Sequence, residues 1–134
     1  MERTLLIVKP DGVKRKLIGE VIKKIEENGF GILDIRFIEL SQKDAEILYE
    51  VHQGKSFYND LLKFITSGPI VALLVEREDA ISKMREVVGT TNPAIAEKGT
   101  IRGDLGGNIE QNVVHASDSK ESAAREIPIF FSYG

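Results

Sequence analysis

The N-terminal part of the chain begins with a continuous apolar run and continues with apolar residues at helical spacing. The first apolar run, Thr4 to Lys9, ends at Pro10-Asp11-Gly12, which predicts a buried strand that closes in a turn. From Ile18 to Ile25, apolar residues recur at i, i+3, i+4 and i+7 with Lys and Glu between them. This spacing predicts an amphipathic helix, and Asn28-Gly29 provides its end.

The next segment changes to a period of two. Over residues 32–40, Leu33, Ile35 and Phe37 alternate with charged residues, as expected of a half-buried strand. Ser41, followed three residues later by an aspartate, resembles a capping box and predicts a helix to about residue 51.

The third part contains the most apolar run of the chain. A helical piece at about 59–66 precedes 69–75, which we expect to be a central strand. Asp79 then caps a helix that ends at Gly89. Residues 89–107 have no hydrophobic period, and a loop of this length within a domain is commonly functional.

The C-terminal part holds a histidine segment, a short helix at about 120–126 capped by Ser119, and a last strand at 127–131. The order of elements predicts an α+β fold: a ferredoxin-like split β-α-β sandwich, with an antiparallel four-stranded sheet and helices packed over one face. We expect residues 1–134 to form a single domain.

Composition narrows the classes of function. The chain has no cysteine, which excludes disulfides and Cys-based metal sites and is compatible with the cytoplasm. It has no apolar run that would span a bilayer, and its N-terminus does not resemble a signal peptide, so no membrane association is expected. A net charge of −3 argues against dedicated nucleic-acid binding, although small anions can still bind at a local cluster of positive charge.

Two short motifs resemble known binding sites but do not match them. Gly54-Lys55-Ser56 resembles the end of a P-loop, yet Tyr49 stands where the first glycine is required. The segment from Gly29 to Leu33 resembles an RNA-binding signature, but isoleucines occupy the positions of the stacking aromatic rings. His52 is expected to be a surface or packing residue, and no residue spacing indicates a closed metal site.

His115 is the candidate nucleophile, with the carboxylate of Glu126 one short helix downstream. A neutral imidazole, with a reference pKa of roughly 6.5, attacks phosphorus without a separate base. Arg85 and Arg102 suit the bidentate recognition of phosphate if the fold brings them to His115. Taken one at a time, each of these residues is more often a structural or solvated side chain.

Five motifs resemble the nucleoside diphosphate kinase family, in its order and spacing and over nearly the whole chain. They are Lys9-Pro10-Asp11-Gly12-Val13, Ser67-Gly68-Pro69, Thr91-Asn92-Pro93, Gly99-Thr100-Ile101-Arg102-Gly103-Asp104 and Asn112-Val113-Val114-His115-Ala116-Ser117-Asp118-Ser119. The resemblance implies that His115 carries a phosphoryl group from a nucleoside triphosphate, mainly ATP, to a nucleoside diphosphate in a ping-pong cycle. One departure is Ala116, where the family often has glycine.

The resemblance also implies a role for each matching residue. Glu126 would hold His115, with Ser117 beside it and Tyr49 close to the transferring group. The other implied contacts are to the nucleotide: Arg85, Thr91 and Arg102 to the phosphates, Lys9 and Asn112 to the sugar, and Phe57 and Leu61 to the base.

Mg²⁺ would arrive on the nucleotide phosphates rather than in a site made by the protein. A stacking ring such as Phe57 does not choose among bases, so we expect broad base tolerance. The resemblance further implies broad sugar tolerance and a homo-oligomer, tetramer or hexamer. Without the resemblance, a ferredoxin-like RNA-binding or small-ligand regulatory module is the alternative.

Overall fold

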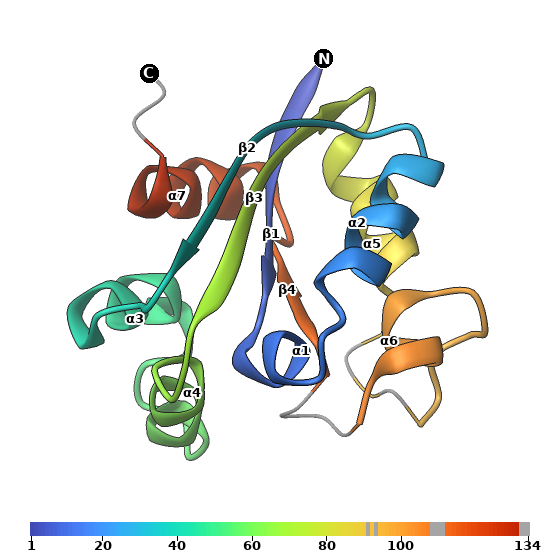
Figure 1. The fold of residues 1–134 in the computed structure, drawn as a ribbon. Coiled ribbons are helices and arrows are strands. Elements are labelled where there is room, and N and C mark those ends of the chain that lie inside the picture. Colours follow the sequence, from blue (N-terminus) through green and yellow to red (C-terminus); the bar gives the residue numbers. More distant parts are fainter. Residues whose placement is uncertain (91, 93, 108–111, 132–134) are drawn as a thin grey trace.

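A four-stranded antiparallel sheet with the strand order β2-β3-β1-β4 forms the centre of the structure (Figure 1). The computed structural model describes residues 1–90, 92, 94–107 and 112–131. The elements are β1 (Glu2–Val8), α1 (Pro10–Lys14), α2 (Ile18–Glu27), β2 (Gly31–Ile38), α3 (Gln42–Leu48), the 3₁₀ turn η1 (Glu50–His52), α4 (Tyr58–Ile65), β3 (Ile70–Arg77), α5 (Ala80–Val88), α6 (Ile101–Leu105), β4 (Val114–Ala116) and α7 (Lys120–Phe130). The predicted α+β class and antiparallel sheet are confirmed.

Helices cover both faces of the sheet, so the expectation of helices over one face only is wrong. Leu6 and Val8 of β1 point into a core shared with α2 and α5, whereas Leu5 and Ile7 point into a second core shared with α3, α4 and α7. Figure 1 shows these two groups of helices on opposite sides of the strands. Burial on both faces explains why β1 and β3 are continuously apolar and do not alternate.

The predicted strand at 127–131 is also wrong, because 127–130 continue helix α7. Ile127, Phe130 and Phe131 are spaced i, i+3 and i+4, and all three pack in the second core. Pro128 is exposed, so the backbone acceptor that it leaves without a partner can face water. The fourth strand is instead β4, which contains His115 and pairs with β1.

The edge strand β2 departs from the inward alternation that its sequence predicted. Leu33, Ile35 and Phe37 are 38, 48 and 63% exposed. A bulge between Ile32 and Asp34 shifts the register against β3. β2 therefore presents an apolar stripe to its surroundings.

The caps of three helices decide where those helices begin. Ser41 and Ser119 accept hydrogen bonds from Asp44 N–H and Ser122 N–H, as predicted. Asp79 occupies the predicted N-cap position of α5, but its side chain makes no such bond. Glu2 takes its place by accepting the Ile81 N–H at 2.8 Å, which ties the start of β1 to α5.

Two loop predictions change as well. Pro10-Asp11-Gly12 forms the first turn of helix α1 and not an isolated turn, with Pro at the first helical position, where its missing N–H has no cost. Within 89–107, residues Ile101–Leu105 form α6, begun by the hydroxyl of Thr100.

Candidate functional site

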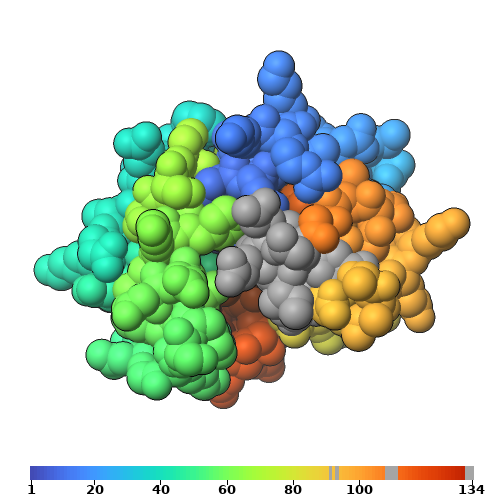
Figure 2. Space-filling model, turned by 90° about the horizontal axis from the view of Figure 1, so that it is seen from below, coloured from blue at the N-terminus to red at the C-terminus, as the bar shows by residue number. Residues whose placement is uncertain are grey.

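A cavity of about 440 Å³ lies where β1, β4, α3, α4 and α7 meet. Figure 2 views the molecule from below, with α4 in green on one side, α6 in orange on the other, and red C-terminal chain visible between them. The lining residues are Lys9, Leu48, Tyr49, Val51, His52, Phe57, Asp60, Leu61, Arg85, Arg102, Asn112, Val114, His115, Ala116, Asp118, Ser122, Arg125 and Glu126.

His115 is the central residue of β4 and pairs with Ile7 of β1. Its imidazole Nε2 lies 2.8 Å from Glu126 Oε1. The same oxygen accepts the Ser117 hydroxyl at 2.9 Å. Among the described residues, no hydrogen bond engages the other ring nitrogen, Nδ1. The imidazole is therefore held from one side, and its second nitrogen remains available.

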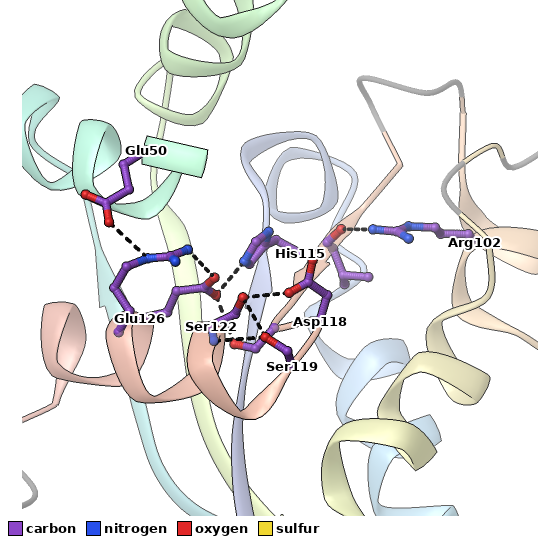
Figure 3. Close-up of polar contacts among 10 residues, drawn as sticks. Glu50, Arg102, His115, Asp118, Ser119, Ser122 and Glu126 are labelled. Atoms are coloured by element: carbon purple, nitrogen blue, oxygen red, sulfur yellow. Dashed lines mark hydrogen bonds and ion pairs between the residues drawn. The ribbon is translucent and has the colours of Figure 1, made fainter. Parts of the chain in front are cut away.

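Glu126 is buried in α7, at 3% exposure, and its second carboxylate oxygen also has a partner. Arg125 donates to Oε2 at 3.3 Å, and Arg125 Nε lies 3.8 Å from Glu50. Figure 3 shows this chain of charges running from Glu50 to the imidazole of His115. A buried carboxylate that is bonded at both oxygens has little freedom to move.

On the opposite side of the cavity, Lys9 Nζ donates to Asn112 Oδ1 at 2.8 Å in a buried contact. Lys9 follows the last residue of β1, and Asn112 precedes β4 by two residues. The pairing of β1 with β4 thus brings together two groups that are 103 positions apart in the sequence.

Arg102 is buried at 6% exposure and is fixed to the backbone. It donates to Val114 O at 2.9 Å and to Gly89 O at 3.3 Å. Burial, and then the nearby charge of Arg85, lower the pKa of Arg102 to about 10, so the guanidinium stays charged at neutral pH. Arg85 and Arg102 both line the cavity, which gives it two positive charges, of which Arg102 is fixed to the backbone.

Aromatic rings form the remaining wall, on η1 and α4. The ring of Tyr49 packs edge-on against His115, with centroids 5.7 Å apart and planes at 89°. Burial, followed by the charge on Glu126, raises the pKa of Tyr49, which keeps its hydroxyl protonated. Phe57 is 43% exposed and lies beside His52, with Leu61 on the next turn of the chain.

The structure gathers most of the predicted site residues around this cavity. Ser117 lies behind it and reaches it only through Glu126. Thr91 lies outside the described residues. Ala116, where glycine was the expected family residue, is buried in β4 opposite Leu6, so the extra methyl group fits the core.

Sequence reasoning missed several residues of the cavity, among them His52, Asp118 and Arg125. His52, interpreted as a surface or packing residue, lines it between the rings of Tyr49 and Phe57. Burial, and then Lys55, lower the pKa of His52. Asp118 accepts the Ser122 hydroxyl at 2.6 Å, which lowers the pKa of Asp118. Arg125 is adjacent in sequence to Glu126, and that adjacency was the available signal.

The described residues contain neither a preformed metal cluster nor a membrane-spanning helix. Within 1–90, 92, 94–107 and 112–131, no group of three or more His, Cys, Asp or Glu side chains could hold a metal ion. No helix in that same part of the chain is long and apolar enough to cross a membrane.

Comparison with known proteins identifies the family. The family model described as nucleoside diphosphate kinase matches residues 2–134. A nucleoside diphosphate kinase of Geobacter sulfurreducens is 54% identical over 132 residues, covering 98% of this chain and 96% of that protein. One of Methanocaldococcus jannaschii is 53% identical over 130 residues, covering 97% and 93%.

Solved structures agree with the sequence relatives. The halophilic nucleoside diphosphate kinase of Halobacterium salinarum, in complex with CDP, has a TM-score of 0.95 at 39% identity, covering 98% of this chain and 88% of that one. The apo enzyme of Encephalitozoon cuniculi has a TM-score of 0.97 at 34% identity, covering 99% and 90%. The chain belongs to the nucleoside diphosphate kinase family and is a phosphotransferase that acts between nucleotides.

Proposed function

We propose that residues 1–134 form one nucleoside diphosphate kinase domain that works through a phosphohistidine at His115. The γ-phosphoryl group of a nucleoside triphosphate, mainly ATP, passes to His115 and then to a nucleoside diphosphate. We place this reaction in the cytoplasm, where nucleotides are made and used.

The observation that carries the proposal is the contact of 2.8 Å between His115 Nε2 and Glu126 Oε1. With the Nε2 proton donated to this carboxylate, the lone pair of the neutral imidazole lies on Nδ1. Nδ1 is therefore the proposed nucleophile. Glu126 stabilises the positive charge that the ring develops as it attacks phosphorus.

The two half-reactions balance without any further reactant. The Nδ1 lone pair forms a bond to the γ-phosphorus of the donor. The bond from that phosphorus to the β–γ bridging oxygen breaks, and the nucleoside diphosphate leaves with the electron pair. A terminal phosphate oxygen of the acceptor diphosphate then bonds to the phosphorus of the phosphohistidine. The P–Nδ1 bond breaks and its electron pair returns to Nδ1, which restores neutral His115.

Charge stabilisation falls to the cations around the cavity. The transition state of phosphoryl transfer is loose and spreads negative charge over the equatorial oxygens. Arg85 and Arg102 line the cavity, and we expect Thr91 to add a phosphate contact. The tie of Arg102 to the carbonyl of Val114 fixes its position relative to His115 before any substrate arrives.

Mg²⁺ is the proposed metal, held mainly by nucleotide phosphates and water. The donors in the cavity fit that mode of binding, because the carboxylates of Asp60 and Asp118 are exposed and do not converge with a third ligand among the described residues. The ion would neutralise phosphate charge during transfer.

The nucleoside end of the substrate would lie against the ring of Phe57, with Leu61 beside it, and Lys9 and Asn112 at the sugar. A half-exposed phenyl ring supplies stacking, which does not discriminate among bases. This arrangement supports broad base and sugar tolerance, and the related Halobacterium enzyme was solved with CDP.

An RNA-binding module of similar fold is less well supported. Such a module stacks bases on the open face of its sheet. Here the side chains of β1 and β3 are buried beneath helices on both faces. The cavity at the sheet's end, and not the sheet face, is the accessible surface.

Labelling with γ-³²P-ATP in the absence of acceptor tests the proposal. We expect about one label per chain, labile in acid and stable in base, that any nucleoside diphosphate discharges. His115→Ala should take up no label, whereas His52→Ala, a change of the other histidine, should still be labelled. Equal labelling of His115→Ala and the wild type would refute the proposal.

We further propose that the enzyme is a homo-oligomer that pairs through β2. This edge strand exposes Leu33, Ile35 and Phe37, and an antiparallel edge can pair with its own copy about a two-fold axis. A second copy packed on β2 would remove the exposed apolar side chains of Leu33, Ile35 and Phe37 from water.

Light scattering after size exclusion tests this interface. Ile35→Asp with Phe37→Asp should give a smaller species than the wild type. Gln42→Asp, which adds one negative charge at a nearby exposed position, should not change the mass. A double variant with the wild-type mass would exclude β2 as the interface.

A further inference from the structure

A γ-turn with an unfavourable backbone conformation precedes the nucleophile. Val114 N–H donates to Asn112 O at 2.9 Å, which closes a three-residue turn with Val113 at its centre. Val113 has φ of 76°, a region that β-branched residues almost never adopt. The turn separates Asn112 from His115, so its shape sets how both side chains enter the cavity.

Three groups from the N-terminal segment hold the turn in place. The carboxylate of Asp11 accepts the Val113 N–H at 3.0 Å, in a buried contact. Lys9 N–H donates to Val113 O at 2.8 Å. Gly12 packs so closely that an added Cβ would lie 3.1 Å from Val113 O and 2.8 Å from Val8 Cγ1.

Asp11 is the side chain in this clamp that no role yet explains. It is 8% exposed, and its Oδ1 has no hydrogen-bond partner among the described residues. Burial of a carboxylate with one oxygen unpaired is unfavourable, so stability alone does not account for an aspartate here. The other oxygen provides the buried N–H of Val113 with an acceptor.

We infer that Asp11 is a positioning residue for His115 and Asn112: its carboxylate keeps Val113 in the left-handed turn that aims both side chains into the cavity. The inference rests on the proposed role of His115 as phosphate carrier. Without the acceptor, Val113 would relax toward φ < 0 and rotate the peptide that leads into β4. A displacement of about 1 Å can slow a reaction by about 100-fold.

Asp11→Asn keeps an acceptor for the Val113 N–H, whereas Asp11→Ala removes it, so the two variants test the hydrogen bond itself. The amide oxygen of asparagine can still accept the Val113 N–H, so Asp11→Asn should form phosphohistidine within about threefold of the wild-type rate. Asp11→Ala should form it about 10- to 100-fold more slowly at saturating ATP. Asp44→Ala, which also removes an aspartate from the first turn of a helix, should leave the rate unchanged.

Rescue by a second substitution distinguishes positioning from stability. Glycine adopts φ near 76° without strain, so Val113→Gly should let the turn form without its clamp. The double variant Asp11→Ala with Val113→Gly should therefore form phosphohistidine at least about fivefold faster than Asp11→Ala. Its melting temperature should nevertheless fall below that of Asp11→Ala, because the buried Val113 side chain is lost.

A purely structural role predicts the same fall in melting temperature, but a double variant that is no faster than Asp11→Ala. That result, or a wild-type rate for Asp11→Ala, overturns the inference. If Asp11→Ala does not fold at the assay temperature, Asp11→Ser with and without Val113→Gly makes the same comparison. Label that persists in His115→Ala would instead locate the failure in the proposed function.

Discussion

The two walls of the cavity are built in contrasting ways. On the β4–α7 wall, His115 and Ser117 each hydrogen-bond to Glu126, and Glu126 and Ser117 are buried. On the η1–α4 wall, Phe57 is 43% exposed and lies against the ring of His52 and the ammonium of Lys55. The difference teaches that fixed geometry is concentrated where a bond would form, and adaptable contact where any base would be accepted.

Glu126→Gln, a change in the β4–α7 wall, should lower kcat more than any other variant considered below. The amide cannot stabilise a positive imidazole, and one of its two positions no longer accepts hydrogen bonds, so we expect kcat to fall by about 100-fold or more. Single-turnover transfer from ATP measures the effect. Glu121→Gln, an exposed change on the same helix, is the control and should leave kcat unchanged. A kcat for Glu126→Gln within twofold of the wild type would contradict the contrast.

Phe57→Ala should weaken the adaptable wall through binding and leave the chemistry intact. Loss of base stacking costs about 1–3 kcal/mol, so KM should rise roughly 5- to 100-fold for every nucleotide while kcat at saturation changes little. Steady-state kinetics with purine and pyrimidine diphosphates measure both constants. Phe57→Tyr keeps the ring and should behave as the wild type. A loss confined to one base would show that this wall selects among bases.

Ser117→Ala should have a smaller effect on the fixed wall. The hydroxyl donates to the same Glu126 oxygen as His115, at 2.9 Å, and its removal leaves the imidazole contact in place. A neutral donor to a charged acceptor contributes about 1.5–3 kcal/mol at most, and part of this is recovered when Glu126 turns toward His115. We expect kcat to fall by roughly fivefold, measured by the same single-turnover assay. A fall as large as that of Glu126→Gln would show that Ser117 takes a direct part in transfer.

The smallest expected effect is a pKa change on the adaptable wall. Burial lowers the pKa of His52 first, and the Lys55 ammonium lowers it next. Lys55→Ala should therefore raise the titration midpoint of His52, as followed by its imidazole proton resonances. Lys43→Ala, an exposed lysine on α3, should not move the midpoint.

The same shift gives the sign of a pH effect on stability. A histidine with a lowered pKa in the folded state gains its proton more readily in the unfolded chain. Protonation of His52 therefore has no effect on the free energy of unfolding well above pH 6.5. As the pH falls from the pKa of His52 in the unfolded chain toward its lower pKa in the folded protein, protonation increasingly destabilises the folded protein. The difference in melting temperature between wild type and His52→Ala should stay constant above pH 8, and below pH 6.5 it should shift against the wild type.

Sequence patterns predicted the central strands, β1 and β3, better than the strands at the edges of the sheet. The runs of β1 and β3 are strongly apolar, and their burial requires no knowledge of the neighbours. At 127–131, however, Ile127, Phe130 and Phe131 fit either a short strand or the last turn of a helix. Only the position of β4, which occupies the sheet edge, decides between them.

The site followed the same division between local and tertiary information. His115 and Glu126 were predicted from motif and resemblance, and they lie in contact. The tie of Arg102 to Val114 O and the place of His52 between two rings depend on packing between distant segments. No periodicity in the sequence indicates either contact.

The brevity of β4 has a consequence for insertions and deletions. His115 faces the cavity because it is the middle of three strand residues, and its neighbours Val114 and Ala116 face the opposite core. Strand side chains alternate with a period of two, so insertion of one residue between Val114 and His115, or deletion of Val114, would turn the imidazole to the wrong side of the sheet. The surface loops between other elements can change length, whereas this segment can change only its side chains.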